Sequence, residues 1–208
     1  MPDIRSPLAA HYSVGRYPAD CAPGVTFRER AGHDLRQIAC WRGRAAALAD
    51  TVERTLGVAP PDAPNRHREA NGIELMTVAP NRLWCLAERG DPRLDELTAS
   101  LDPEIGCTTE LGHSQIRLRI RGPATRPLLA QEIALDLAPD AFPAGAIART
   151  AFHHVPVLLS CVAADNDGVF DLFLPHTFAA SAWDYLLDLA SAHGYAIEAP
   201  TGHTDATG

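Results

Sequence analysis

Residues 115–122, QIRLRIRG, show the clearest secondary-structure pattern in the chain. Three aliphatic residues alternate there with three arginines, namely Ile116, Leu118 and Ile120 with Arg117, Arg119 and Arg121. Alternation with a period of two is typical of a β-strand that buries one face and exposes the other. Like charges along one strand repel each other, so we expect acidic residues on the adjacent strands or on another chain.

Similar patterns predict further elements on both sides of this strand. Short apolar runs bounded by turn residues predict strands at 25–30, 35–41, 73–78, 83–87 and 169–174, and strands within 147–161. Apolar residues at helical spacing predict helices at 45–56, 91–101, 122–137 and 177–193. Gly57 and Gly194 stand where a residue in the left-handed conformation would end two of these helices.

The order of these elements indicates the fold class. Pairs of strands followed by a helix recur, and several strands are joined by tight turns, so we expect an α+β fold with mainly antiparallel sheets and helices packed on them. Residues 25–198 are predicted to form a single compact unit of two interlocked, related halves, about 25–104 and 105–198. Residues 1–24 contain four prolines and are expected to form an extended arm, and residues 199–208 a flexible tail.

The composition excludes several functions. The formal net charge of −8 makes nucleic acid and anionic membranes poor partners. All 18 basic residues are arginine, so the chain has neither a Schiff-base lysine nor a phosphate-loop lysine. No GxGxxG motif is present, which argues against a self-contained dinucleotide site.

The cysteines and the hydropathy pattern point to a reducing compartment. Five cysteines stand far apart without a CxxC pair, namely Cys21, Cys40, Cys85, Cys107 and Cys161. An odd, widely spaced set favours neither a disulfide framework nor a cysteine metal site. Because there is also no secretion-type leader and no apolar run long enough for a membrane span, we expect a cytoplasmic protein.

Two adjacent histidines, His153 and His154, precede an aliphatic run in the stretch FHHVPVLL. Neighbouring side chains of a strand point to opposite faces, so this pair is a poor chelate for one metal ion. We expect one histidine to cap the core and the other to face solvent or a partner.

The C-terminal helix has an apolar arc wider than a single core contact requires. It is predicted either to be covered on two sides or to lie in a thick core within the domain. Together with the arginines and the histidines, it suggests candidates for a subunit interface: Arg117, Arg119, Arg121, His153, His154, Phe178, Trp183 and Leu187. We identify no catalytic, cofactor-binding or metal-ligating residue from the sequence.

Two weaker patterns do not support a site. No GxSxG motif places a serine on a nucleophile elbow. Asp165, Asp167 and Asp171 lie close together in DNDGVFD, but the spacing is wrong for a calcium loop and a hairpin turn explains DNDG better.

Three consecutive segments carry a family resemblance: RGPATRPLLAQEIALDL at 121–137, APDAFPAGAIARTAFHHVPVLL at 138–159 and FDLFLPHTFAASAWDYLLDLASAHG at 170–194. The order of GP, a helix, ALDL, FPAG, a threonine before a hydrophobic strand, LFLP and FAAS resembles the gamma subunit of heterotetrameric sarcosine oxidase. The N-terminal RSPLAA also fits. This chain departs from the family pattern before Ser114. The family tends to have an acidic residue and a glutamine there, whereas this chain has Leu111, Gly112 and His113.

The resemblance implies a fold similar to the folate-binding domain of aminomethyltransferases. It also implies a complex with alpha, beta and delta subunits that demethylates sarcosine to glycine oxidatively. The resemblance assigns FAD, FMN, NAD and tetrahydrofolate to partner subunits, with zinc as an option for the delta subunit, and gives this chain an assembly role without a cofactor.

Two alternatives stay open. The chain could belong to a sister complex that oxidises another N-methyl compound. It could also be a free-standing, folate-dependent methyl-group transferase, which needs a carboxylate for the pteridine ring; Glu110, Asp136 and Asp171 are the candidates.

Overall fold

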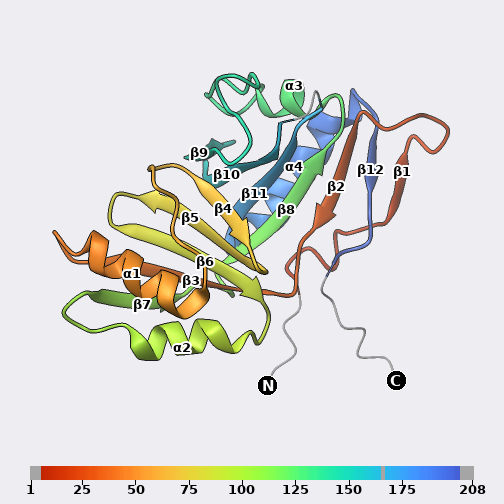
Figure 1. The fold of residues 1–208 in the computed structure, drawn as a ribbon. Helices are drawn as coiled ribbons and strands as arrows, with labels where there is room; N and C mark the ends of the chain where they lie inside the picture. The colour runs from red at the N-terminus through yellow and green to blue at the C-terminus, as the bar shows by residue number, and fades with distance from the viewer. Residues whose placement is uncertain (1–5, 165–166, 202–208) are drawn as a thin grey trace, which may run out of the picture. The chain divides into compact units, whose positions relative to one another are not determined.

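The computed structural model describes residues 6–164 and 167–201 (Figure 1). The chain divides into two compact units, which are described separately below. Unit 1 comprises the chain up to Ala31 and from Ser114 onward, and unit 2 is the segment Gly32–His113. The sequence predicted two successive halves that meet near residue 104. The structure instead inserts unit 2 into unit 1, a long-range arrangement that local patterns do not reveal.

Unit 1 contains a seven-stranded sheet in the order β1-β12-β2-β8-β11-β10-β9. Its elements are β1 (Gly15–Tyr17), β2 (Val25–Glu29), β8 (Gln115–Arg121), α3 (Thr125–Leu129), β9 (Ile147–Phe152), β10 (Val155–Ala163), β11 (Val169–Pro175), the 3-10 turn η1 (His176–Phe178), α4 (Ala179–Ser191) and β12 (Tyr195–Ile197). β12 and β2 run parallel, and the other strand pairs of this sheet are antiparallel. The predicted α+β class with mainly antiparallel sheets is confirmed.

The core of unit 1 lies between this sheet and α4 (Figure 1). Leu118 of β8 is fully buried there, as the alternating pattern predicts, and so is its register partner Leu172 of β11. Trp183 of α4 is also fully buried; its ring lies 5.7 Å from that of Phe27 on β2 and 5.3 Å from that of Tyr12. The wide apolar arc of α4 therefore packs in a thick core.

Much of the predicted N-terminal arm belongs to this unit. Leu8 is fully buried in the core, and the Tyr12 hydroxyl donates a hydrogen bond to the carbonyl of Glu198 at 2.6 Å. β1 then adds an edge strand beside β12. Because these contacts join the two ends of the chain, the sequence near residue 10 could not reveal them. Residues 1–5 and 202–208 lie outside the described ranges.

The helix predicted at 122–137 is wrong in length. α3 covers only Thr125–Leu129, and turns follow it. Ile133 still donates to the carbonyl of Leu129, but the side chain of Asp136 then accepts from the backbone of Ala138 at 2.9 Å. The helical pattern has already ended by then, since Leu135 donates to the carbonyl of Ile133 and not to that of Gln131. The apolar residues of this segment, such as Ile133 and Leu137, are still buried in the core, but they belong to a loop of successive turns.

The histidine pair does not lie on a strand, so the prediction of one inward and one outward histidine is wrong. β9 and β10 pair directly at Phe152 and Val155, and His153 and His154 form the two-residue turn between them. Their φ angles are +44° and +68°, as a type I′ hairpin requires at both central positions. Both side chains are exposed because a turn of this kind projects from the sheet.

Unit 2 contains a five-stranded antiparallel sheet in the order β4-β5-β6-β3-β7. Its elements are β3 (His33–Cys40), α1 (Ala45–Leu56), β4 (His67–Ala70), β5 (Ile73–Ala79), β6 (Arg82–Glu88), α2 (Pro92–Ser100) and β7 (Gly106–Glu110). Both helices share one core with this sheet (Figure 1). Gly57 ends α1 with a φ of +69°, as predicted. Within the described residues, no helix has the length and apolar character needed to cross a bilayer.

Replacing a buried and an exposed aromatic residue near α4 should change the stability of the chain by different amounts. Trp183→Ala is expected to lower the free energy of unfolding by about 3–5 kcal/mol, because it leaves a large cavity between α4 and the sheet. Phe178→Ala should change it by less than about 0.5 kcal/mol, since Phe178 is 46% exposed. Urea unfolding curves of the full chain measure both, and equal losses would contradict this assignment.

Candidate functional site

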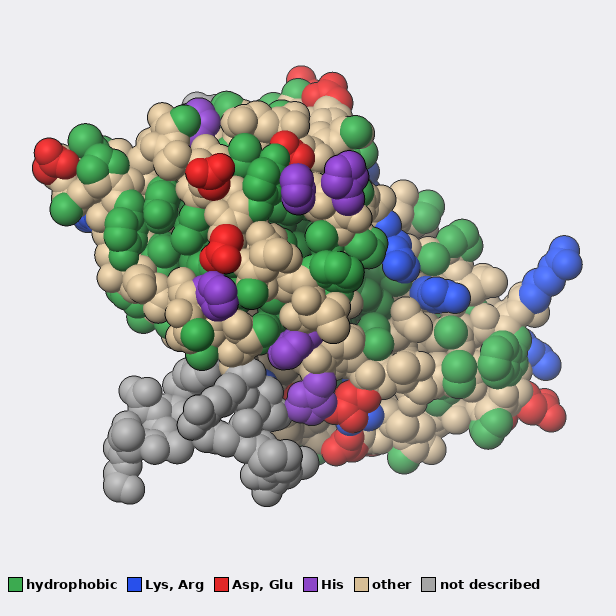
Figure 2. Space-filling view, turned by 180° about the vertical axis from the view of Figure 1, so that it is seen from behind, with side chains coloured by type: hydrophobic (Ala, Val, Ile, Leu, Met, Phe, Trp, Pro, Cys, Tyr) green, Lys and Arg blue, Asp and Glu red, His purple; other side chains and the backbone are tan. Residues whose placement is uncertain are grey.

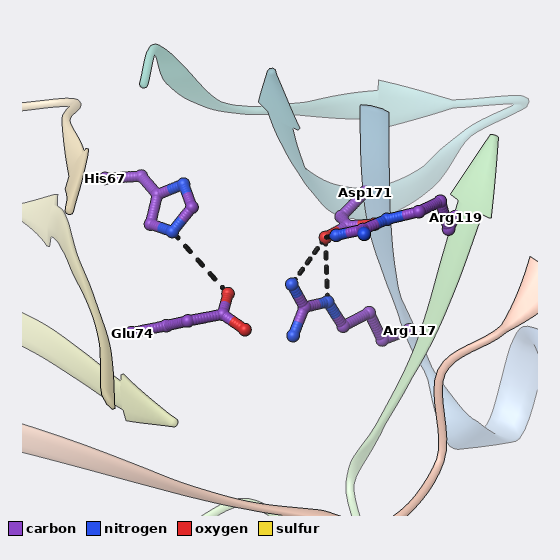
Figure 3. A network of polar contacts seen from close by, with 5 residues as sticks. All are labelled: His67, Glu74, Arg117, Arg119 and Asp171. Atoms are coloured by element: carbon purple, nitrogen blue, oxygen red, sulfur yellow. Dashed lines mark hydrogen bonds and ion pairs between the residues drawn. The ribbon is translucent and has the colours of Figure 1, made fainter. Parts of the chain in front are cut away.

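A buried ion network joins β8 and β11 in unit 1 (Figure 3). Asp171 is fully buried, and it lies directly opposite Arg119 in the strand register. Arg119 donates to both carboxylate oxygens at 2.8 Å, and the Arg117 Nε donates to Oδ2 at 2.9 Å. The acidic neighbour predicted for the arginine strand is therefore present on the adjacent strand.

The network fixes the charge state of Asp171. Burial alone would raise the pKa of this carboxyl group, but the hydrogen bond from Arg119 and the charges of Arg117 and Arg119 outweigh burial, so the pKa lies below its usual value. Asp171 thus stays ionised and is bonded to two guanidinium groups. Both of its oxygens are engaged within unit 1.

A second cluster on the same sheet bridges β8, β2 and the segment after β12. Glu198 forms ion pairs with Arg28 and Arg121. Thr26, Val169 and Arg119 complete the lining of a cavity of about 230 Å³ at this place. Four arginines and two carboxylates take part in the ion pairs of these two clusters.

The candidate interface residues fall into three groups by exposure. Arg121, His153, His154 and Phe178 are exposed. Arg119 and Leu187 are half-buried, and Leu187 packs against the core of unit 1. Arg117 and Trp183 are buried, at 2% and 0% exposed. The first group is therefore the part of the predicted interface that can contact a partner without rearrangement.

His153 also contacts α4. Its ring stacks on the ring of Tyr185 with 3.8 Å between centroids, and the Tyr185 hydroxyl donates to Glu132 at 2.6 Å. That hydrogen bond raises the pKa of Tyr185. The turn is thus attached to α4 by a small polar cluster at the surface of unit 1.

Exposed aromatic side chains are few among the described residues. Tyr17, Trp41 and Phe178 are the large exposed ones. On the face shown in Figure 2, hydrophobic side chains are interrupted by single carboxylate and histidine side chains. An apolar contact on this face would therefore have a polar surround, as is typical of subunit interfaces that form between folded chains.

The three carboxylates considered for folate lie on different elements. Glu110 ends β7 in unit 2, whereas Asp136 follows α3 in unit 1 and accepts from the backbone of Ala138. Asp171 is engaged by two arginines. The stretch DNDGVFD contributes no further carboxylate to a site, since Asp165 lies outside the described residues and Asp167 is exposed.

Sequence reasoning missed one group of side chains in unit 2. His67 and Glu69 of β4 and Glu74 of β5 bring three ligand atoms within 4.8 Å of one another. Figure 3 shows His67 and Glu74 pointing toward each other, with 3.5 Å between Nε2 and Oε2. The sequence pattern predicts no strand at residues 67–70, so it does not pair these side chains. The signal that could have found them is the dipeptide Asn71-Gly72, a strong hairpin signal.

Unit 2 also contains a mainly apolar cavity of about 400 Å³. It lies between α1, the proline-rich segment 60–64 and the turn that joins β5 to β6. The lining includes Cys40, Leu48 and Leu83, with Asp62 and Arg82 as its charged residues. No group of these residues has the arrangement of a nucleophile and a base.

Comparison with known proteins gives matches at the level of structure. Neither a family model nor a curated protein matches the sequence. A chain of the heterotetrameric sarcosine oxidase from Corynebacterium sp. U-96, solved in complex with pyrrole 2-carboxylate, matches with a TM-score of 0.76 and 26% identity. The match covers 91% of this chain and 96% of that one.

An aminomethyltransferase gives a second match. The glycine cleavage system aminomethyltransferase T from Bartonella henselae matches with a TM-score of 0.61 and 14% identity, over 86% of this chain and 48% of that one. This chain thus spans about half of the aminomethyltransferase, and the likeness concerns the fold. The predicted resemblance is confirmed: the chain is similar to a chain of heterotetrameric sarcosine oxidase over nearly its whole length, in a fold related to that of aminomethyltransferases.

Proposed function

We propose that this chain is the gamma subunit of a heterotetrameric sarcosine oxidase and that it acts in assembly, without a catalytic site of its own. The observation that carries the proposal is the similarity to one chain of such an oxidase over 96% of that chain's length. The GP, FPAG, LFLP and FAAS motifs support the gamma assignment in particular.

In the proposed complex, alpha, beta and delta subunits carry the chemistry. They hold FAD, FMN, NAD and tetrahydrofolate, with zinc as an option for the delta subunit. The complex oxidises the N-methyl group of sarcosine with O2 as the electron acceptor and tetrahydrofolate as the one-carbon acceptor, yielding glycine, hydrogen peroxide and methylene-tetrahydrofolate. A sister complex that acts on another N-methyl compound is the variant of this proposal, because this chain would not line the substrate pocket. A cytoplasmic location belongs to the proposal, and the lack of a disulfide among the five cysteines supports it.

The surface of unit 1 suggests how contact would be made. Phe178 offers an exposed aromatic side chain directly before α4, and Arg121 offers a half-exposed guanidinium beside the basic cavity. Aromatic residues and arginine are the residue types that most often dominate interfaces. The guanidinium groups of Arg28, Arg119 and Arg121 around this cavity favour an acidic surface on the partner.

Co-expression with the subunits encoded by neighbouring genes tests the assembly role. We expect a stoichiometric, flavin-containing complex with the wild-type chain and no flavin on the chain alone. Phe178→Asp and Arg121→Glu should each weaken assembly by about tenfold or more, as measured by the complex recovered on gel filtration.

Glu96→Arg is the matched control, because Glu96 is exposed on α2 of unit 2 and belongs to no candidate contact. Its complex yield should equal that of the wild type. A monomer that remains separate from these subunits at micromolar concentration would contradict the assembly role.

The alternative, a free-standing folate-dependent transferase, finds little support in unit 1. Asp171 already accepts hydrogen bonds from two arginines on both oxygens, so it has little capacity left for a pteridine ring. We expect no heat of binding when tetrahydrofolate is titrated into the isolated chain. Binding at micromolar concentration would instead favour the transferase.

Asp171 is expected to act on stability. Asp171→Asn removes the charge of a buried carboxylate that is bonded to two arginines and should lower the free energy of unfolding by about 3–5 kcal/mol at neutral pH. The pKa of this carboxyl group is lowered in the folded chain, so its contribution is complete above the unfolded pKa of about 4 and is lost as the pH falls through the folded value.

Urea unfolding of both proteins between about pH 7 and pH 2 measures this effect. The difference between wild type and Asp171→Asn should stay constant down to about pH 4 and shrink below it. A difference that stays unchanged to pH 2 would show that the charge of Asp171 does not contribute.

A further inference from the structure

The turn Asn71-Gly72 determines which side chains of β4 and β5 face each other. Both residues have a positive φ, +53° and +76°, as the two-residue type I′ hairpin requires. This turn fixes the register, so that Glu69 lies directly opposite Glu74. Side chains alternate along a strand, and His67 therefore lies on the same face as Glu69.

Two of the three side chains are buried and the third is exposed, so an ion could reach the cluster from solvent. The side chains of His67 and Glu74 are only 6% and 10% exposed, whereas Glu69 is exposed at the rim. Their ligand atoms lie within 4.8 Å of one another. In a tetrahedral zinc site with bonds of about 2.0–2.2 Å, two ligand atoms are about 3.3–3.6 Å apart. The 3.5 Å between His67 Nε2 and Glu74 Oε2 agrees with that spacing.

The side chains at this place are of kinds that bind divalent cations. Two carboxylates stand directly opposite each other on adjacent strands. One of them, Glu74, is buried.

We propose that His67, Glu69 and Glu74 bind one divalent transition-metal ion, with Zn²⁺ the best fit. An imidazole nitrogen with two carboxylates is a borderline ligand set that Zn²⁺ accepts, whereas Ca²⁺ and Mg²⁺ prefer oxygen ligands only. Three protein ligands leave a fourth tetrahedral position open to water or to another ligand. The ion clamps β4 to β5 within unit 2, and this role does not depend on the proposed assembly function.

The test uses the full chain after removal of metal with a chelator and dialysis. Co²⁺ is added first, because its visible d–d absorption reports a tetrahedral site directly, and Zn²⁺ is then added to displace it. We expect one equivalent of each per chain and a higher melting temperature with Zn²⁺. Even groups that only orient a metal ligand are worth about 10- to 100-fold in affinity, so His67→Gln and Glu69→Gln should each weaken Zn²⁺ binding by at least about tenfold.

His113→Gln and Glu96→Gln are matched controls, since both residues are exposed in unit 2 outside the cluster. Both controls should keep the wild-type affinity. Glu69→Gln is the variant least prone to disturb the fold because Glu69 is exposed, and melting without metal checks each variant. The proposal is overturned if the wild type shows no Co²⁺ spectrum, or if Glu69→Gln and His67→Gln bind Zn²⁺ as tightly as their controls. In that case His67 and Glu74 form a simple ion pair.

Discussion

The bond between Asp171 and two arginines is the contact on which the arrangement of unit 1 depends. β8 lies inside the seven-stranded sheet with three arginines on one face, and β2 adds Arg28 directly opposite Arg119. The guanidinium groups on these neighbouring strands repel one another, most strongly at Arg117 and Arg119, which are the least exposed of the four. Asp171 on β11 and Glu198 after β12 place a carboxylate on each side of β8. The sheet can therefore keep β8 in its interior, where the opposite face of the strand forms the core under α4.

Local patterns in the sequence predicted many of the helices and strands correctly. The alternation in residues 115–122, the helical spacing in 45–56 and the cap at Gly57 each correspond to an element with nearly the predicted bounds. These elements are local, and their periodicity follows directly from which face is buried. The helix predicted at 122–137 was too long: α3 ends at Leu129, and the last helix-type backbone bond, from Ile133 to the carbonyl of Leu129, is followed by a tighter turn in which Leu135 donates to Ile133.

The division into units and the candidate sites were less accessible to sequence reasoning. The pairing of β2 with β8 joins residues about 90 positions apart, and no local pattern encodes it. His153 and His154 looked like strand residues because apolar residues flank them; only their backbone angles reveal the turn. The group of His67, Glu69 and Glu74 was within reach, because Asn71-Gly72 sets the hairpin register by itself. β4 is short and polar, so no apolar pattern predicts it as a strand.

The insertion of unit 2 into unit 1 has a consequence for the order of folding during synthesis. Unit 2 is continuous in sequence, so all of its strand pairs can form as soon as His113 has left the ribosome. β2, by contrast, is made before unit 2 and must wait for β8 to be synthesised after it. Until then the apolar side chains of Val25 and Phe27 have no partner strand to cover them. During this interval the nascent chain has a folded unit 2, while β2 is still unpaired. A chaperone or an already folded partner chain that covers the apolar side chains of β2 would have its largest effect at this stage.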